Sequence, residues 1–177
     1  MNKSAIIKEP YRYSLKRQWD DFNLNKVTFV LLNPSTADEN IDDRTTQRCL
    51  SFAKKQDCGS LEIVNLFAYR SRDWQELKDL SLEEATGPEN QFYIETALYS
   101  SAKIIVGWGE NCKIHYKDYN ELSQWFKGYS LHCLGTTAEG HPRHPLFVKS
   151  TTELIPYEFP IKAERPVQPR QAQDRGM

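Results

Sequence analysis

Apolar and polar positions follow two different periods along this chain, and the alternation between them predicts the order of its elements. Residues 12–19 alternate at every second position, which is typical of a half-buried strand. Short and nearly continuous apolar runs are typical of strands that are covered on both faces. They occupy residues 27–32, 61–67, 103–107 and 130–134.

Helical spacing of apolar positions appears between these runs. The predicted helices cover residues 44–56, 89–100 and 112–126. Asp42 or Asp43 is placed to cap the first turn of the first helix. Four apolar strands separated by helices indicate βαβ units with right-handed crossovers.

The predicted fold class is therefore α/β, a single three-layer domain with a mainly parallel four-stranded central sheet plus an N-terminal strand. We expect this domain to span residues 1–159. The segment 160–177 combines Pro, Gln and Arg without apolar periodicity, which predicts a disordered tail.

Composition narrows the function classes. Lys+Arg 23 against Asp+Glu 24 leaves a net charge of −1, so affinity for nucleic acid requires a local basic patch. The 4 cysteines are scattered, with no spacing that predicts a metal site, and we expect them to be reduced. No apolar run reaches about 18 residues, the length that spans a membrane. We expect a cytoplasmic protein that needs no cofactor, no metal and no obligatory protein partner.

Polar residues follow the predicted strands at the edge where ligands bind in parallel sheets. Asn33-Pro34-Ser35 ends the first apolar run, and Asn33 is a candidate to orient a water molecule. The other reading of this tripeptide is ordinary turn chemistry. Asn65 carries a donor and an acceptor side by side, as a nucleobase edge does. It could equally well hold its own neighbouring loop in place.

Charged residues complete the candidate site. Asp38 or Asp43 is a candidate base, although Asp43 and its neighbour Asp42 are also placed to cap a helix. The string GHPRHPLF holds His141, Arg143 and His144 between prolines, and a rigid cationic loop suits an anion.

Aromatic and basic residues extend this site. The aromatic residues at strand ends can stack on a base or pack in the core, and they are Phe67, Tyr69, Trp108 and Phe147. The candidates for phosphate contacts are Arg44, Arg48, Arg70, Arg72 and the basic tail.

Six strings taken together, RYSLKRQWD, LLNPSTAD, DDRTTQRC, VNLFAYRS, VGWG and GHPRHPLF, resemble a bacterial and phage family known as DUF1643. The resemblance runs from about Tyr11 to Phe159. The same order of elements is similar to the uracil-DNA glycosylase superfamily, with LLNPS, IVN and HPL in place of its site strings. Leu146 occupies the place of a serine in the last of these.

The second resemblance implies a glycosylase-like domain in which Asn33 positions water, Asn65 reads the base and His144 donates to the departing base. It implies a monofunctional DNA glycosylase, a hydrolase that flips out and excises a damaged or modified base. The phage association points to modified cytosine and to defence or repair. Two alternatives stay open: an N-glycosidase acting on nucleosides or nucleotides, and a non-catalytic module that binds nucleic acid or nucleotides.

Overall fold

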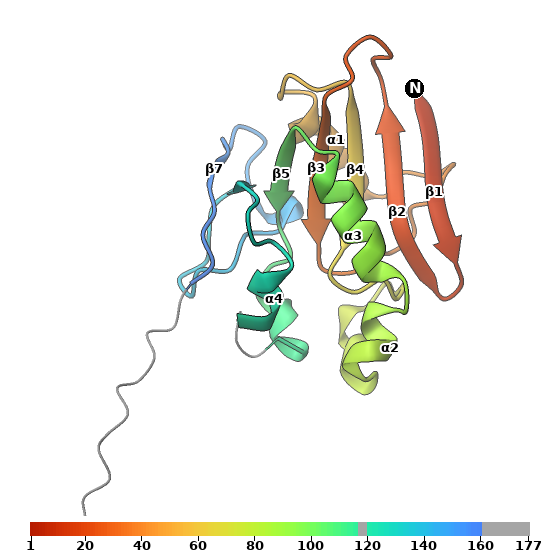
Figure 1. The fold of residues 1–177 in the computed structure, drawn as a ribbon, viewed down its shortest axis with the longest axis vertical. Helices are drawn as coiled ribbons and strands as arrows, with labels where there is room; N and C mark the ends of the chain where they lie inside the picture. Colours follow the sequence, from red (N-terminus) through yellow and green to blue (C-terminus); the bar gives the residue numbers. More distant parts are fainter. Residues whose placement is uncertain (117–119, 161–177) are drawn as a thin grey trace, which may run out of the picture.

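The computed structural model describes residues 1–116 and 120–160, and it is an α/β protein built on one seven-stranded mixed sheet (Figure 1). The strands in chain order are β1 (Asn2–Lys8), β2 (Tyr11–Gln18), β3 (Lys26–Leu31), β4 (Ser60–Asn65), β5 (Lys103–Val106), β6 (Leu131–Cys133) and β7 (Ile155–Pro156). Their order across the sheet is β1-β2-β4-β3-β5-β6-β7. Strand β3 pairs in parallel with β4 and β5, and β5 pairs in parallel with β6. The remaining pairs are antiparallel.

Helices cover both faces of the sheet. They are α1 (Arg44–Ala53), η1 (Trp74–Asp79), α2 (Leu82–Thr86), α3 (Asn90–Tyr99), η2 (Glu110–Ile114), α4 (Asn120–Gln124) and η3 (Pro145–Phe147). Side chains alternate between the two faces along a strand. On β3, Phe29 and Leu31 belong to a cluster with α1, whereas Val30 belongs to a cluster with α3. The sheet is therefore the middle layer between two cores.

The chain order places a switch point at β3. The crossover through α1 leads from β3 to β4 on one side, and the crossover through α3 leads from β4 to β5 on the other side of β3. Open α/β sheets bind ligands outside the carboxyl ends of the strands where the order reverses in this way. The edge beyond Leu31 and Val106 is thus the expected position of a site.

The structure confirms the α/β class and corrects the size and type of the predicted sheet. A mainly parallel sheet of four strands plus one becomes a mixed sheet of seven, because the sequence analysis missed β1 and the two-residue β7. Strand β1 is largely half-exposed and pairs with β2 alone. An edge strand of this kind has little apolar signal to detect. Helix α1 begins as predicted, since Asp43 Oδ1 accepts a hydrogen bond from Thr46 N at 2.7 Å.

The predicted helix over 112–126 is wrong as a continuous element. The chain forms η2 and α4 instead, and residues 117–119 between them lie outside the described range. His115 ends η2, and its ring packs edge-on against Phe67 while Nε2 lies 3.0 Å from the Leu77 carbonyl oxygen. These tertiary contacts override the local helical pattern. The predicted disordered tail begins at residue 160, and residues 161–177 also lie outside the described range.

Among the described residues, no helix is long and apolar enough to cross a membrane.

Candidate functional site

A cleft of about 560 Å³ opens at the carboxyl ends of β3 and β5, at the switch point of the sheet. It brings together candidates from three separate predicted loops: Asn33 and Ser35 after β3, Trp108 after β5, and Arg143 and His144 after β6. Thr45 reaches it from the first turn of α1. The other lining residues are Leu32, Ser71, Arg72, Trp74, Gly109, Glu110, Asn111, Thr137, Leu146 and Phe147.

The orientation of the Asn33 amide is fixed by two hydrogen bonds. Its Nδ2 donates to the carbonyl oxygens of Pro34, at 3.2 Å, and Ser71, at 3.1 Å. Because only the NH2 group of an amide donates, these bonds identify Oδ1 as the acceptor end. Asn33 thus offers the cleft a positioned hydrogen-bond acceptor, which is what a water-orienting residue requires.

His144 presents the complementary group. Its Nδ1 accepts a hydrogen bond from Leu146 N at 3.3 Å, which leaves Nε2 to carry the proton of the neutral ring. Burial lowers the pKa of His144 to about 4, and the charge of Asp43 opposes this shift only in part. At neutral pH the side chain is therefore an uncharged imidazole that donates from Nε2.

Asp43 is the predicted carboxylate that lies close to this histidine. One of its oxygens caps α1. Its charge also raises the pKa of Arg12, whose pKa burial lowers to about 10. The charge of Asp43 therefore acts on both a buried guanidinium and His144.

Asp38 has a different place. Its Oδ1 accepts hydrogen bonds of 2.8 Å from both Asn40 N and Ile41 N, and these bonds hold the pKa of Asp38 below its usual range. It does not line the cleft. Asp43 does not line the cleft either, but its charge acts on His144, so Asp43 stays the candidate base of the two.

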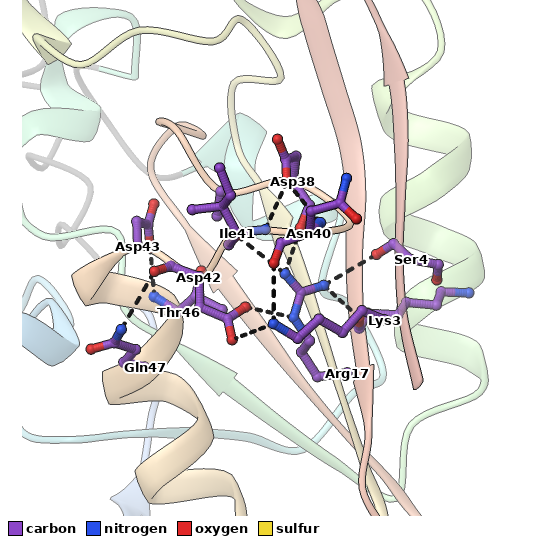
Figure 2. A network of polar contacts seen from close by, with 12 residues as sticks. Lys3, Ser4, Arg17, Asp38, Asn40, Ile41, Asp42, Asp43, Thr46 and Gln47 are labelled. Atoms are coloured by element: carbon purple, nitrogen blue, oxygen red, sulfur yellow. Dashed lines mark hydrogen bonds and ion pairs between the residues drawn. The ribbon is translucent and has the colours of Figure 1, made fainter. Parts of the chain in front are cut away.

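A buried arginine holds the loop that carries these carboxylates (Figure 2). The side chain of Arg17 is fully buried and donates to Asp42 Oδ1 at 2.7 Å and to the Asp38 carbonyl oxygen at 2.5 Å. Lys3 adds an ion pair to the other Asp42 oxygen at 3.1 Å. We call Arg17, Asp42 and Lys3 the loop clamp.

Asn65 is almost completely buried and does not line the cleft. Its Oδ1 accepts from Arg12 Nη2 at 3.3 Å, and Arg12 Nη1 donates to the Ala37 carbonyl oxygen at 3.0 Å. The structure thus places Asn65 outside the cleft, and its role in reading a base stays a prediction. Asn65 and Arg12 instead hold the loop after β3 against the end of β4.

The predicted aromatic residues divide between core and cleft. Phe67 is fully buried and stacks on Tyr116 with ring centroids 5.8 Å apart, so it cannot stack on a base. Tyr69 packs against the same core and meets Tyr11 edge-on. Trp108 is buried and lines the cleft, and Phe147, with 80% of its surface exposed, lies at its rim.

His141 is buried away from the cleft, three residues before His144. Its Nδ1 lies 3.7 Å from Cys112 Sγ, and its Nε2 lies 3.6 Å from Glu139. The carbonyl of Pro142 accepts from Gly109 N at 2.9 Å, so the loop after β6 is attached to the loop after β5. His141 therefore contacts Cys112 and Glu139 outside the cleft, and its role in binding a ligand stays a prediction. Burial lowers its pKa.

The predicted phosphate-binding arginines also differ in their places. Arg48 donates to the carbonyls of Pro145 and Val148, which attaches η3 to α1. Arg70 forms an ion pair with Glu9 outside the cleft. Arg44 and Arg72 are exposed, and Arg72 lines the cleft. The basic tail lies outside the described residues.

The region that contains this site matches the model of a known protein family. The family model of DUF1643, described as a protein of unknown function, matches residues 12–146. The chain belongs to the DUF1643 family. No curated protein and no solved structure matches the chain.

The DUF1643 region begins at Arg12 and includes every cleft residue except Phe147, whereas β1 and β7 lie outside it. Site residues that the sequence analysis missed are Arg12, Arg17, Thr45, Ser71 and Trp74. A signal existed for Arg17, because it falls in the apolar series of an alternating strand, where a charge must find a buried partner. Arg12 falls in the polar series, so its burial had no such signal. No group of three or more metal-binding side chains occurs within residues 1–116 and 120–160.

Proposed function

We propose that this protein hydrolyses the N-glycosidic bond of a modified or damaged base in DNA. One observation carries the proposal: Asn33 and His144 line one cleft at the switch point, the first as a fixed acceptor and the second as an uncharged Nε2–H donor. Hydrolysis of this bond needs both groups, since water must be oriented toward C1′ and the departing base carries negative charge.

The reaction assigns one task to each group. Asn33 Oδ1 accepts a hydrogen bond from the attacking water while the bond between C1′ and the water oxygen forms. The bond between C1′ and the base nitrogen breaks, and the base keeps the electron pair, which the Nε2–H of His144 stabilises. The negative charge of Asp43 favours the positive charge that develops on the sugar. The Asp43 carboxylate accepts the proton lost by the water.

The cleft supports a planar substrate. Its lining contains half-exposed Trp74, and exposed Phe147 at the rim offers a second aromatic surface for a base that leaves its stack. Since Asn65 and Phe67 lie outside the cleft, recognition of the base edge falls to other lining groups, such as Thr45 and Asn111. This departure from the uracil-DNA glycosylase pattern supports a base other than uracil.

A nucleotide N-glycosidase is the second candidate. Arg48 and Arg70 bind other groups of the protein itself, the Pro145 carbonyl and Glu9. This leaves few cations near the cleft for a long polyanion, which favours a nucleotide as the substrate. We expect a glycosidase of this kind to cleave free nucleotides as well as it cleaves strands.

The test is base release from DNA oligonucleotides that carry uracil, hypoxanthine, or methylated, hydroxymethylated or glucosylated cytosine, with strand cleavage after alkali as the readout. We expect abasic sites on at least one substrate. Asn33→Ala and His144→Gln should each slow the reaction by about 10²–10³-fold, because each removes a group that acts on developing charge. His132→Gln, a histidine on β6 outside the cleft, is the matched control and should keep the full rate.

Two outcomes contradict the proposal. One is the absence of base release from every DNA and every free nucleotide tested. The other is release that persists at the full rate in both cleft variants, which would place the chemistry elsewhere in the molecule.

A further inference from the structure

A second cavity, of about 820 Å³, lies beside the cleft and shares a wall with it. We call it the arginine groove, and it is lined by Glu9, Ser35, Thr36, Ile41, Arg70, Ser71 and Arg72. Ser35, Ser71 and Arg72 line the cleft as well. A molecule that occupies the cleft and extends past this wall therefore enters the groove.

The groove offers the groups that bind phosphate. Arg72 is exposed, and no hydrogen bond or ion pair of its side chain occurs within the described ranges. The buried Nε of Arg70 likewise has no acceptor among the described residues. Guanidinium groups bind phosphate oxygens through two parallel hydrogen bonds, and the hydroxyls of Ser35 and Thr36 can add neutral donors.

Arg70, the second arginine of the groove, is already paired with a carboxylate. Glu9, in the turn between β1 and β2, forms an ion pair with Arg70, and its side chain is 68% exposed. Because the Glu9 partner is exposed, salt screens this pair, and a phosphate with more charge can replace the carboxylate at the half-buried Arg70. Ile41, with 59% of its surface exposed, adds an apolar side chain that suits the face of a sugar or a base.

We propose that the arginine groove binds the phosphodiester backbone on one side of the nucleotide whose base enters the cleft, and that Glu9 occupies Arg70 until the strand displaces it. This inference rests on the proposed function. The substrate is then a nucleic-acid strand rather than a free nucleoside, since a nucleoside ends at the shared wall. Glu9 lowers the affinity for strands that cannot deliver a phosphate to Arg70.

The test measures binding, so it does not depend on knowing the base. The probe is a fluorescein-labelled single-stranded DNA of about 10 nucleotides, within the usual footprint of such proteins, with a tetrahydrofuran abasic residue at its centre. Fluorescence anisotropy gives Kd for the full chain over a series of KCl concentrations. Circular dichroism melting checks that each variant is folded.

The test compares variants that are expected to raise Kd with variants that are expected to lower it. Arg72→Gln should weaken binding on the order of tenfold at about 0.1 M KCl and lower the slope of log K against log salt by about 1. Glu9→Gln should tighten binding by about threefold, because it frees Arg70. Glu9→Gln combined with Arg70→Gln should lose that gain. Lys127 is exposed and lines neither cavity, so Lys127→Gln should change Kd less than twofold.

The groove is overturned if Arg72→Gln and Lys127→Gln weaken binding equally, or if Glu9→Gln leaves Kd unchanged. Comparison with base release separates this inference from the proposed function. If the variants show the expected binding pattern but no base is released, the groove proposal stands and the glycosidase proposal is contradicted. If base release is equally fast from nucleosides and strands and is unaffected by Arg72→Gln, the glycosidase proposal stands and the groove proposal is contradicted.

Discussion

The loops after β3 and β6 meet at one cleft, yet they are held in place by different means. The loop after β3 is held by side chains, since Arg12 and Arg17 bind its carbonyls and its three aspartates bind backbone or the loop clamp. The loop after β6 is held largely by its own backbone, with Thr137 N donating to His141 O and Arg143 N to Gly135 O, each at 2.9 Å. The first loop therefore uses its carboxylates within the fold and offers neutral side chains such as Asn33 and Ser35 to the cleft, whereas the second offers Arg143 and His144.

The largest effect should come from breaking the clamp of the first loop. Arg17→Ala leaves the Asp42 carboxylate with only Lys3 and removes the donors to the loop carbonyls, so we expect a loss of about 3–5 kcal/mol in the free energy of unfolding. Urea denaturation measures it. Lys3→Ala, which removes the half-exposed partner of the same carboxylate, should cost less than about 1 kcal/mol. Equal losses in the two variants would mean that Arg17 does not hold the loop.

A smaller effect should separate the two roles of Asp43. Asp43→Ala removes the cap of α1 and should lower stability by about 1 kcal/mol, whereas Asp43→Asn keeps a capping oxygen and should stay close to the wild type. Both variants remove the charge near His144, and we expect both to slow base release. A full rate in Asp43→Asn would show that the residue acts only as a cap.

A third effect should appear as a pH dependence of the second loop. Burial holds the pKa of folded His144 at about 4, against 6.5 in the unfolded chain, so the unfolded state binds more protons between these values. Stability should fall as the pH is lowered through this window, since protonation removes the Nδ1 acceptor from Leu146 N. His141, whose pKa is also lowered, adds a fall of the same sign.

Unfolding midpoints in urea between about pH 7 and pH 4.5 measure this dependence. His144→Gln should show a shallower fall than the wild type, with the contribution of His141 remaining. Superimposable profiles would contradict the assignment of a buried neutral ring to His144.

Much of the central sheet follows from the sequence because its strands are apolar on both faces. Residues 27–32 and 103–107 are apolar apart from Thr28 and Lys103, and they form most of β3 and β5. The edge strands β1 and β7 are half-exposed or exposed, so their patterns resemble those of loops. The segment after Cys112 was mispredicted because His115 makes contacts with distant residues that no local period contains.

The site was predictable as a set of loops but not residue by residue. The rule that ligands bind at carboxyl ends of parallel strands brings Asn33, Trp108 and His144 together correctly. It does not say which way a side chain at a strand end turns, and Asn65 and Phe67 turn inward. His141 and His144 share one loop and similar neighbours in sequence, so only the position of Cys112 in space distinguishes them.

The tryptophan in the cleft wall gives the molecule an optical property. Trp108 and Trp74 are two of the 4 tryptophans, and both line the cleft. A ligand in the cleft would change the surroundings of half-exposed Trp74 directly, whereas Trp108, which is 1% exposed, would respond through the residues that cover it. The protein therefore contains its own fluorophore at the place where occupancy matters, and its intrinsic emission can report binding without any label.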